Sequence, residues 1–136
     1  MNTILDAATA VFKLINVNSV KSTLTGGIYK YRRPANSTKE DIVINTPSLS
    51  DGTRQLGVVN VNIYVPDIQQ IVNGTPVFLA NTSRIETLTN LVKPFLEETD
   101  GDTFALWIDH FEMFDEPDIN QHFMNIRLRM QMYNHH

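Results

Sequence analysis

The chain has 136 residues, of which 42% are hydrophobic; this is enough for one domain with a buried core and too few for two. Its formal net charge of -4 argues against a surface dedicated to nucleic acid, because phosphate neutralisation needs an excess of lysine and arginine. The sequence contains no cysteine, which excludes disulfides, thiolate nucleophiles and zinc-thiolate sites.

Neither end of the sequence suggests a targeting segment. The N-terminal run carries Asp6 and Lys13 among its apolar residues and lacks the charged start of a secretory signal. We therefore expect neither a signal peptide nor a membrane span. His135 and His136 are typical of the remnant of an expression tag. The remaining residues, 1–134, are expected to form a single α+β domain.

The first element expected is a helix. Apolar residues at helical spacing predict it over residues 3–15, with Thr3 as the N-cap and Asp6 as the acidic partner in the first turn. One apolar side of this helix is continuous, so we expect the helix to lie on the sheet. The polar stretch that follows, residues 17–24, has room for one more helical turn.

Three strands are expected next. A short strand begins at Ile28, after two glycines, and ends before Pro34. Alternating apolar and polar residues predict two further strands over residues 41–46 and 55–65, and the second of these is rich in β-branched residues. The connection between them is rich in turn residues, which indicates an antiparallel hairpin with a long loop.

The segment from residue 68 to residue 79 has no clear periodicity. Pro66 and Asp67 stop the preceding strand, and the dipeptide Asn73-Gly74 stands in the middle of the segment, followed by a second proline at Pro76. Glycine and proline are the strongest breakers of regular structure. The segment is therefore predicted to be an irregular insertion or a short flap.

A second helix is predicted from Ser83 to Leu96, where apolar residues again recur at helical spacing. Ser83 and Glu86 have the spacing of a capping box. Pro94 lies inside the pattern and is expected to bend or loosen the helix, because it removes one backbone donor and crowds the carbonyl group of Asn90.

A hairpin is predicted to close the chain, with strands over residues 104–114 and 121–133. The apolar alternate positions Met124 to Met132 are the expected core lining, with an adaptable contact surface as the alternative. Trp107 and Phe111 are expected to share one face as core or interface anchors. The sequence thus predicts an α+β fold in the order α-β-β-β-α-β-β, with two helices on an antiparallel sheet of about five strands.

Titratable residues gather around this final hairpin. Carboxylates and imidazoles can bind a divalent cation or act as acid and base, but their spacing here matches no metal-loop pattern, and a solvated turn is the favoured interpretation. The sequence also lacks the motifs of a nucleophile elbow, a phosphate loop or a zinc-binding helix. We therefore expect no catalytic, cofactor or metal residues. The cluster comprises Asp109, His110, Glu112, Asp115, Glu116, Asp118 and His122.

Charge is distributed unevenly along the chain. Residues up to Arg54 include seven lysines or arginines against four acids, whereas the segment from Glu97 to Asp118 includes nine acids and no base. Opposite lobes of this kind suit head-to-tail association, in which a basic rim meets the acidic rim of the next copy. A chance imbalance on a solvated surface remains open as the alternative.

The order of elements and several local phrases resemble the small tail-completion proteins of long-tailed bacteriophages, the tail terminator and head-tail joining group. The likeness spans nearly the whole chain and consists of patterns of apolar and turn residues. The matching segments are Gly27-Ile28-Tyr29 to Pro34, Asp41 to Thr46, Val59 to Val65, Ser83 to Leu96 and the terminal hairpin.

The resemblance implies a structural protein of a phage or prophage virion and not an enzyme. Such proteins form a homo-oligomeric ring, commonly of six subunits, that ends the tail tube and docks to the head connector. The implied partners are tail-tube and head-connector proteins, with DNA only as passing cargo, no membrane and no cofactor. The implied location is the tail or neck of the virion, assembled in the cytoplasm of a bacterial host.

Two candidate interface edges follow from the charge lobes together with this resemblance. The basic edge comprises Lys30, Arg32 and Arg33, and the acidic edge comprises Asp115, Glu116 and Asp118. Two alternatives stay open. One is a small metal-dependent enzyme that uses Asp109, His110, Glu112 and His122, and the other is a ligand-binding module with a pocket between the second helix and the sheet.

Overall fold

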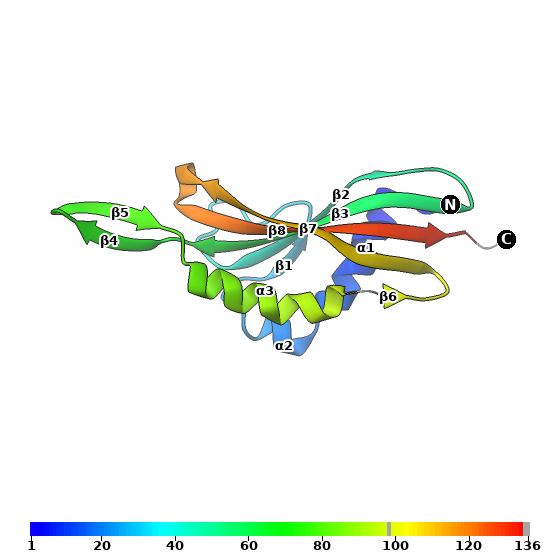
Figure 1. Ribbon diagram of the computed structural model, residues 1–136, viewed down its shortest axis with the longest axis horizontal. Helices are drawn as coiled ribbons and strands as arrows, with labels where there is room; N and C mark the ends of the chain where they lie inside the picture. The colour runs from blue at the N-terminus through cyan, green and yellow to red at the C-terminus, as the bar shows by residue number, and fades with distance from the viewer. Residues whose placement is uncertain (98, 135–136) are drawn as a thin grey trace.

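A twisted six-stranded sheet forms the body of the protein, with its strands along the long axis (Figure 1). The computed structural model describes residues 1–97 and 99–134, so the expected tag remnant at 135–136 lies outside the described residues. The strand order is β1-β2-β3-β8-β7-β6, and only β1 and β2 pair in parallel. The bounds are β1 Ile28–Lys30, β2 Asp41–Leu49, β3 Arg54–Pro66, β6 Thr99–Asp100, β7 Phe104–Glu116 and β8 Gln121–Tyr133.

The two central strands, β3 and β8, define the buried face. They pair in antiparallel register along their whole length, from Arg54 opposite Tyr133 to Pro66 opposite Gln121. Side chains alternate across a strand, so every second residue of each strand points to the helices. The expected core lining of the last strand is confirmed, with Ile126, Leu128 and Met130 fully buried, and the facing residues of β3 that are buried with them are Val59, Val61, Ile63 and Val65.

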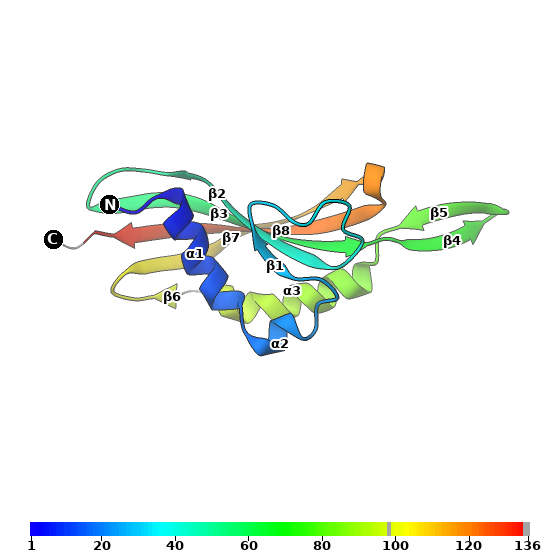
Figure 2. The ribbon, with the colours of Figure 1, turned by 180° about the vertical axis from the view of Figure 1, so that it is seen from behind.

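The three α-helices of the described residues cover one face of the sheet and leave the other face open (Figures 1 and 2). They are α1 (Ile4–Ile15), α2 (Asn18–Lys21) and α3 (Thr82–Leu96). The predicted cap of α1 is confirmed, since the Thr3 hydroxyl oxygen accepts a hydrogen bond from the Asp6 backbone and the Asp6 carboxylate accepts one from the Thr3 backbone. This reciprocal pair satisfies two backbone donors that the helix leaves free.

The start of α3 differs from the prediction. The helix begins at Thr82, and the side-chain oxygen of Asn81 accepts a hydrogen bond from the Arg84 backbone at 3.2 Å. The expected capping box of Ser83 and Glu86 is therefore wrong, because Ser83 already lies in the first turn. The helix passes through Pro94 and ends two residues later, so the proline lies where its cost to the hydrogen-bond ladder is confined to the last turn.

The α+β class and the predicted order of the main elements are confirmed. The predicted antiparallel pairing of the strands at 41–46 and 55–65 is also confirmed, although β2 extends to Leu49. The sheet has six strands instead of about five, because the two-residue strand β6 adds to the edge beside β7. A strand of two residues leaves no periodic pattern in a sequence.

Residues 68–79, which we call the arm, form a second sheet that projects beyond the body (Figure 1). The arm consists of β4 (Ile68–Val72) and β5 (Thr75–Leu79), which pair in regular antiparallel register. The expected irregular insertion or flap is thus a regular hairpin. Asn73 and Gly74 both have positive φ, 52° and 77°, as the two central residues of a tight type I′ turn require.

Strand β7 contains one extra residue at Asp109. Ile108 lies opposite Leu128 and His110 lies opposite Arg127, so Asp109 has no partner of its own. An extra residue in one strand of an antiparallel pair shifts the alternation of all that follows. Trp107 therefore lies on the open face and Phe111 on the helix-covered face, and the expectation that they share a face is wrong.

Candidate functional site

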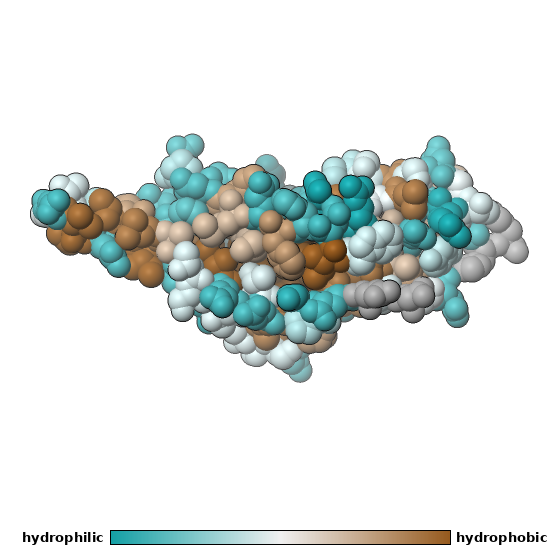
Figure 3. All heavy atoms as spheres, viewed as in Figure 1, coloured by the Kyte–Doolittle hydropathy of each residue, from teal (hydrophilic) through white to brown (hydrophobic). Residues whose placement is uncertain are grey.

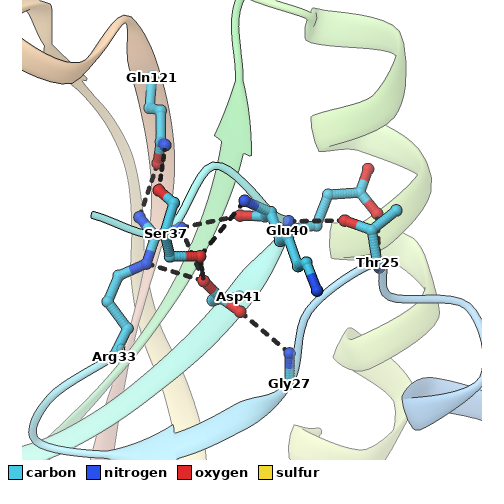
Figure 4. Close-up of polar contacts among 8 residues, drawn as sticks. Thr25, Gly27, Arg33, Ser37, Glu40, Asp41 and Gln121 are labelled. Carbon is cyan, nitrogen blue, oxygen red and sulfur yellow. Dashed lines mark hydrogen bonds and ion pairs between the residues drawn. The ribbon is translucent and has the colours of Figure 1, made fainter. Parts of the chain in front are cut away.

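A buried polar network holds the loop between β1 and β2 against the sheet (Figure 4). At its centre is Asp41, whose side chain is 1% exposed. One carboxylate oxygen accepts hydrogen bonds from Arg33 Nε at 2.9 Å and from the Ser37 hydroxyl, and the other accepts one from the Gly27 backbone at 3.0 Å. Arg33 also donates to the Gln121 side chain at 2.6 Å. The network thereby ties the loop to the first residue of β8.

A second ion pair extends this network to helix α3. The Arg84 guanidinium donates to both carboxylate oxygens of Glu40, at 2.8 Å for Nη2 with Oε1. This hydrogen bond to Arg84 holds the pKa of Glu40 below its usual value against the opposing effect of burial, and a backbone hydrogen bond from Thr25 acts in the same direction. Glu40 and Asp41 are adjacent and engage different partners, so they join the helix, the loop and the sheet at one corner.

The structure separates the three residues of the predicted basic edge. Arg33 is 13% exposed and fully engaged in the network, whereas Lys30 and Arg32 are exposed. The Lys30 ammonium group donates to the Thr9 hydroxyl at 3.2 Å and lies 5.5 Å from the ring centroid of Phe12. Of this set, only Lys30 and Arg32 are therefore exposed on the surface.

The predicted acidic edge lies at the turn between β7 and β8. Asp115 and Asp118 are exposed, and Glu116 is half-buried. Burial raises the pKa of Tyr64, and the charge of Glu116 adds to this rise while that of Arg33 opposes it. Arg33 itself lies 4.3 Å from the ring centroid of Tyr64, so the acidic turn and Arg33 lie near the same end of the sheet.

The four residues of the proposed metal-dependent enzyme are not brought together. Asp109 pairs with Arg127 at 2.9 Å. Desolvation raises the pKa of Asp109, but hydrogen bonds and charges of Arg127 and Arg129 together outweigh it, so the pKa lies below its usual value. His110 and Glu112 line a hollow on the open face, whereas His122 lies opposite Val65 on the helix-covered face. The sheet itself thus stands between the two histidines.

His122 has a different pair of acidic neighbours. Its Nδ1 atom lies 2.6 Å from Asp67 and its Nε2 atom 3.5 Å from Asp115, and one potential ligand atom from each residue falls within a 4.8 Å group. Asp67 was missed from the sequence because it lies 55 residues from His122 and follows a strand-ending proline. A hydrogen bond of the Asp67 backbone to Asn120 at 2.9 Å shows that the contact fixes the root of the arm to the turn.

Two hollows in the described residues are worth comparing with ligand sites. One lies on the open face and has a volume of about 490 Å³; its asparagines, Asn60, Asn62 and Asn125, hydrogen-bond to one another. The other is an apolar groove of about 200 Å³ between α3 and β7, below the 300–1,000 Å³ typical of ligand pockets. We call it the edge groove; it is lined by Thr82, Ile85, Glu86, Thr89, Asn90, Met113 and Met124.

Large apolar side chains are exposed in two neighbouring regions (Figure 3). The arm is the first, with Ile71 70% exposed. The second is the outer part of β7, where Phe111 is 41% exposed, and Figure 3 shows an apolar strip between β7 and α3 on the same side of the molecule as the arm. The further exposed apolar residues of the two regions are Ile68, Val72, Phe78, Leu79, Trp107, Met113 and Phe114.

No described helix has the length and apolar character needed to cross a membrane. No protein-family model and no curated protein matches the sequence. Among solved structures, the chain is similar to a chain of the structure described as the virion of a native gene transfer agent (GTA) particle, with 12% identity and a TM-score of 0.61. The match covers 98% of this chain and 100% of that one. The protein therefore shares its fold, over nearly its whole length, with a chain of that virion.

Proposed function

We propose that this protein is a structural component of a phage-like virion and carries out no reaction. The observation that carries the proposal is the likeness to a chain of a gene transfer agent virion, which spans 98% of this chain and all of that one. Within the final hairpin, Asp109 is paired with arginines and the two histidines lie on opposite faces of the sheet, as a structural role allows.

Within the virion, we assign the protein to the tail terminator or head-tail joining type. In this role it forms a ring that ends the tail tube and docks to the head connector, while DNA passes through; rings of this group commonly have six copies. The element order of this group supports the assignment, and so does the net charge of -4, because an acidic ring does not retain passing DNA. A ring requires unlike surfaces that meet head to tail, and the chain presents several.

The exposed charges give the ring a set of candidate contacts. Lys30 and Arg32 supply the basic side, and Asp115 and Asp118 supply the acidic side. Arg33 is engaged within its own chain and Glu116 is half-buried, so neither is counted among these contacts. Exposed ion pairs add little affinity by themselves, so the charges select the orientation of the contact and apolar surface supplies its strength.

Assembly on a tail tube tests the proposal. The protein is incubated with the tail-tube protein encoded in the same genome, and tube lengths are measured by negative-stain electron microscopy. We expect shorter tubes with a ring of this protein at one end, and a weaker effect at high salt because salt screens the charged contacts. Tubes of unchanged length with no bound protein would contradict the proposed function.

The metal-dependent alternative is tested separately. Zinc, manganese and calcium are titrated into the protein by calorimetry, with an Asp67→Asn variant as the control. The proposed function predicts no binding heat that depends on Asp67. Tight binding that is lost in this variant would instead support a metal site at His122, Asp67 and Asp115, the group that the fold brings within 4.8 Å.

A further inference from the structure

Both faces of the arm are mainly apolar, with a glutamine on each. Its cross-strand pairs place Ile68, Val72 and Leu79 on one side and Ile71 and Phe78 on the other, and each of these five side chains is exposed. The segment from Ile68 to Ala80 also contains no charged residue. A two-stranded hairpin is marginally stable by itself in water. The arm therefore has the surface of an element that another surface covers.

The outer edge of β7 is a matching uncovered surface. Beyond Leu106, this strand has no partner on its outer side among the described residues, so alternate backbone N–H and C=O groups remain free for another strand. The apolar side chains of Phe111 and Met113 stand beside these groups. The edge groove continues this apolar surface toward α3.

We propose that the arm of one copy lies along the outer edge of β7 in a second copy and fills the edge groove. The backbone of the arm extends the neighbour's sheet, and its apolar side chains cover Phe111 and Met113. Strands of five residues span about 16 Å at 3.3 Å per residue, which is shorter than the free part of β7. The contact joins two different surfaces, the arm of one copy and the β7 edge of the next, as a ring requires. This inference rests on the proposed function and specifies which surfaces of the subunits meet.

Charge favours this pairing over pairing between two β7 edges. From Asp109 to Asp118 the edge and its turn carry five acids and no base besides His110. Two such edges side by side bring like charges together, which is unfavourable across strands. The uncharged arm avoids this repulsion. Pairing between two arms also avoids it, but leaves Phe111 and Met113 uncovered.

Disulfide trapping tests the contact, and the absence of native cysteine makes each introduced thiol unique. An Ile71→Cys chain is mixed with a Met113→Cys chain of different length, oxidised and separated without reductant. We expect the mixed dimer to exceed both homodimers at least threefold. The matched control replaces Ile71→Cys by Leu5→Cys, because Leu5 is 60% exposed and lies in α1 at the opposite end of the molecule (Figure 2).

Each outcome of the trapping experiment is decisive. A mixed dimer no more abundant than that of the control overturns the proposal. A dominant Ile71→Cys homodimer overturns it in favour of arm-to-arm pairing, and a dominant Met113→Cys homodimer overturns it in favour of edge-to-edge pairing. An excess of the mixed dimer supports it.

The tube assay separates this proposal from the proposed function. We expect Ile71→Asp to raise the dissociation constant for self-association at least tenfold and to abolish the shortening of tubes, while Leu5→Asp does neither. If Ile71→Asp shortens tubes as well as the unaltered protein, the arm contact fails and the proposed function stands. If the unaltered protein binds no tubes while the mixed dimer still forms, the proposed function fails and the arm contact stands.

Discussion

Two segments leave the sheet between its strands, and they differ in how they are held. The loop of residues 31–40 is tied down by buried ion pairs at Asp41 and Glu40. The arm, residues 68–79, is fixed at its root, through Asp67. The loop turns polar groups inward, whereas the arm turns apolar groups outward. The loop thus uses its polar groups to stabilise the fold of its own chain, whereas the apolar surface of the arm is left for the contact that we propose.

Replacing Asp41, the centre of the loop network, should give the largest loss in the free energy of unfolding. Asp41→Ala leaves Arg33 buried without its partner, and loss of one member of a buried ion pair costs about 3–5 kcal/mol. Urea unfolding followed by the fluorescence of the single tryptophan measures this loss. Asp51→Ala, in an exposed turn, is the control and should change the free energy of unfolding by no more than about 0.5 kcal/mol. A similar small change for Asp41→Ala would refute the structural role of the network.

A glycine beside the network gives the next largest effect. A Cβ atom on Gly26 would lie 1.9 Å from Asp41 Oδ1 and 2.5 Å from the Glu40 carbonyl oxygen, so Gly26→Ala should lower the free energy of unfolding by about 1–3 kcal/mol. Gly101→Ala is the matched control, because the nearest atom to its Cβ is 3.7 Å away. Equal stability of the two variants in urea would show that the corner accommodates the extra methyl group.

The ion pair of Glu40 and Arg84 predicts a smaller effect that depends on pH. The pKa of Glu40 is lowered by its hydrogen bond to Arg84, so its contribution is present above the ordinary glutamate value of 4.5 and is lost as pH falls through the lowered pKa. Glu40→Gln should cost about 1 kcal/mol at pH 7, and the difference from the unaltered protein should shrink on acidification. A difference that stays constant from pH 7 to pH 3 would contradict this linkage.

The arm should show the smallest effect on stability. Ile71→Asp changes an exposed side chain outside the core, so we expect the free energy of unfolding to change by no more than about 0.5 kcal/mol. The measurement is the same urea unfolding, made at a protein concentration low enough to keep the chains apart. A loss above about 2 kcal/mol would mean that the arm packs on its own body, and the contrast between the two segments would disappear.

The sequence predicts the body of the fold because local pattern and tertiary role agree there. Thr3 caps the first helix as its sequence pattern predicts, and β3 and β8 pair without a shift in register, so their predicted alternation is retained. Prediction fails where one extra residue reverses which side chains of a strand face the core. Asp109 is an extra residue in β7, and nothing in its neighbours marks it, so Trp107 and Phe111 were placed on one face although they lie on opposite faces.

The candidate site was less predictable because its contacts join distant residues. The charge lobes and the family resemblance grouped Arg33 with Lys30 and Arg32, but the ion pair with buried Asp41 removes Arg33 from the surface. The arm did carry a local signal, since Asn73-Gly74 between two apolar runs is a strong indicator of a tight hairpin turn. Pro76 obscured it, because proline in a strand usually argues against one.

The direction of the arm has a mechanical consequence. Its first strand, β4, continues roughly along the line of β3 (Figure 1), and β3 is bonded to β8 from Arg54 to Pro66 without a break in register. A pull along the arm therefore loads these backbone hydrogen bonds in shear, so that many must yield together. A pull across the strands would instead open them one at a time. In the proposed contact between copies, tension along the arm would therefore act in the direction in which β3 and β8 resist separation best.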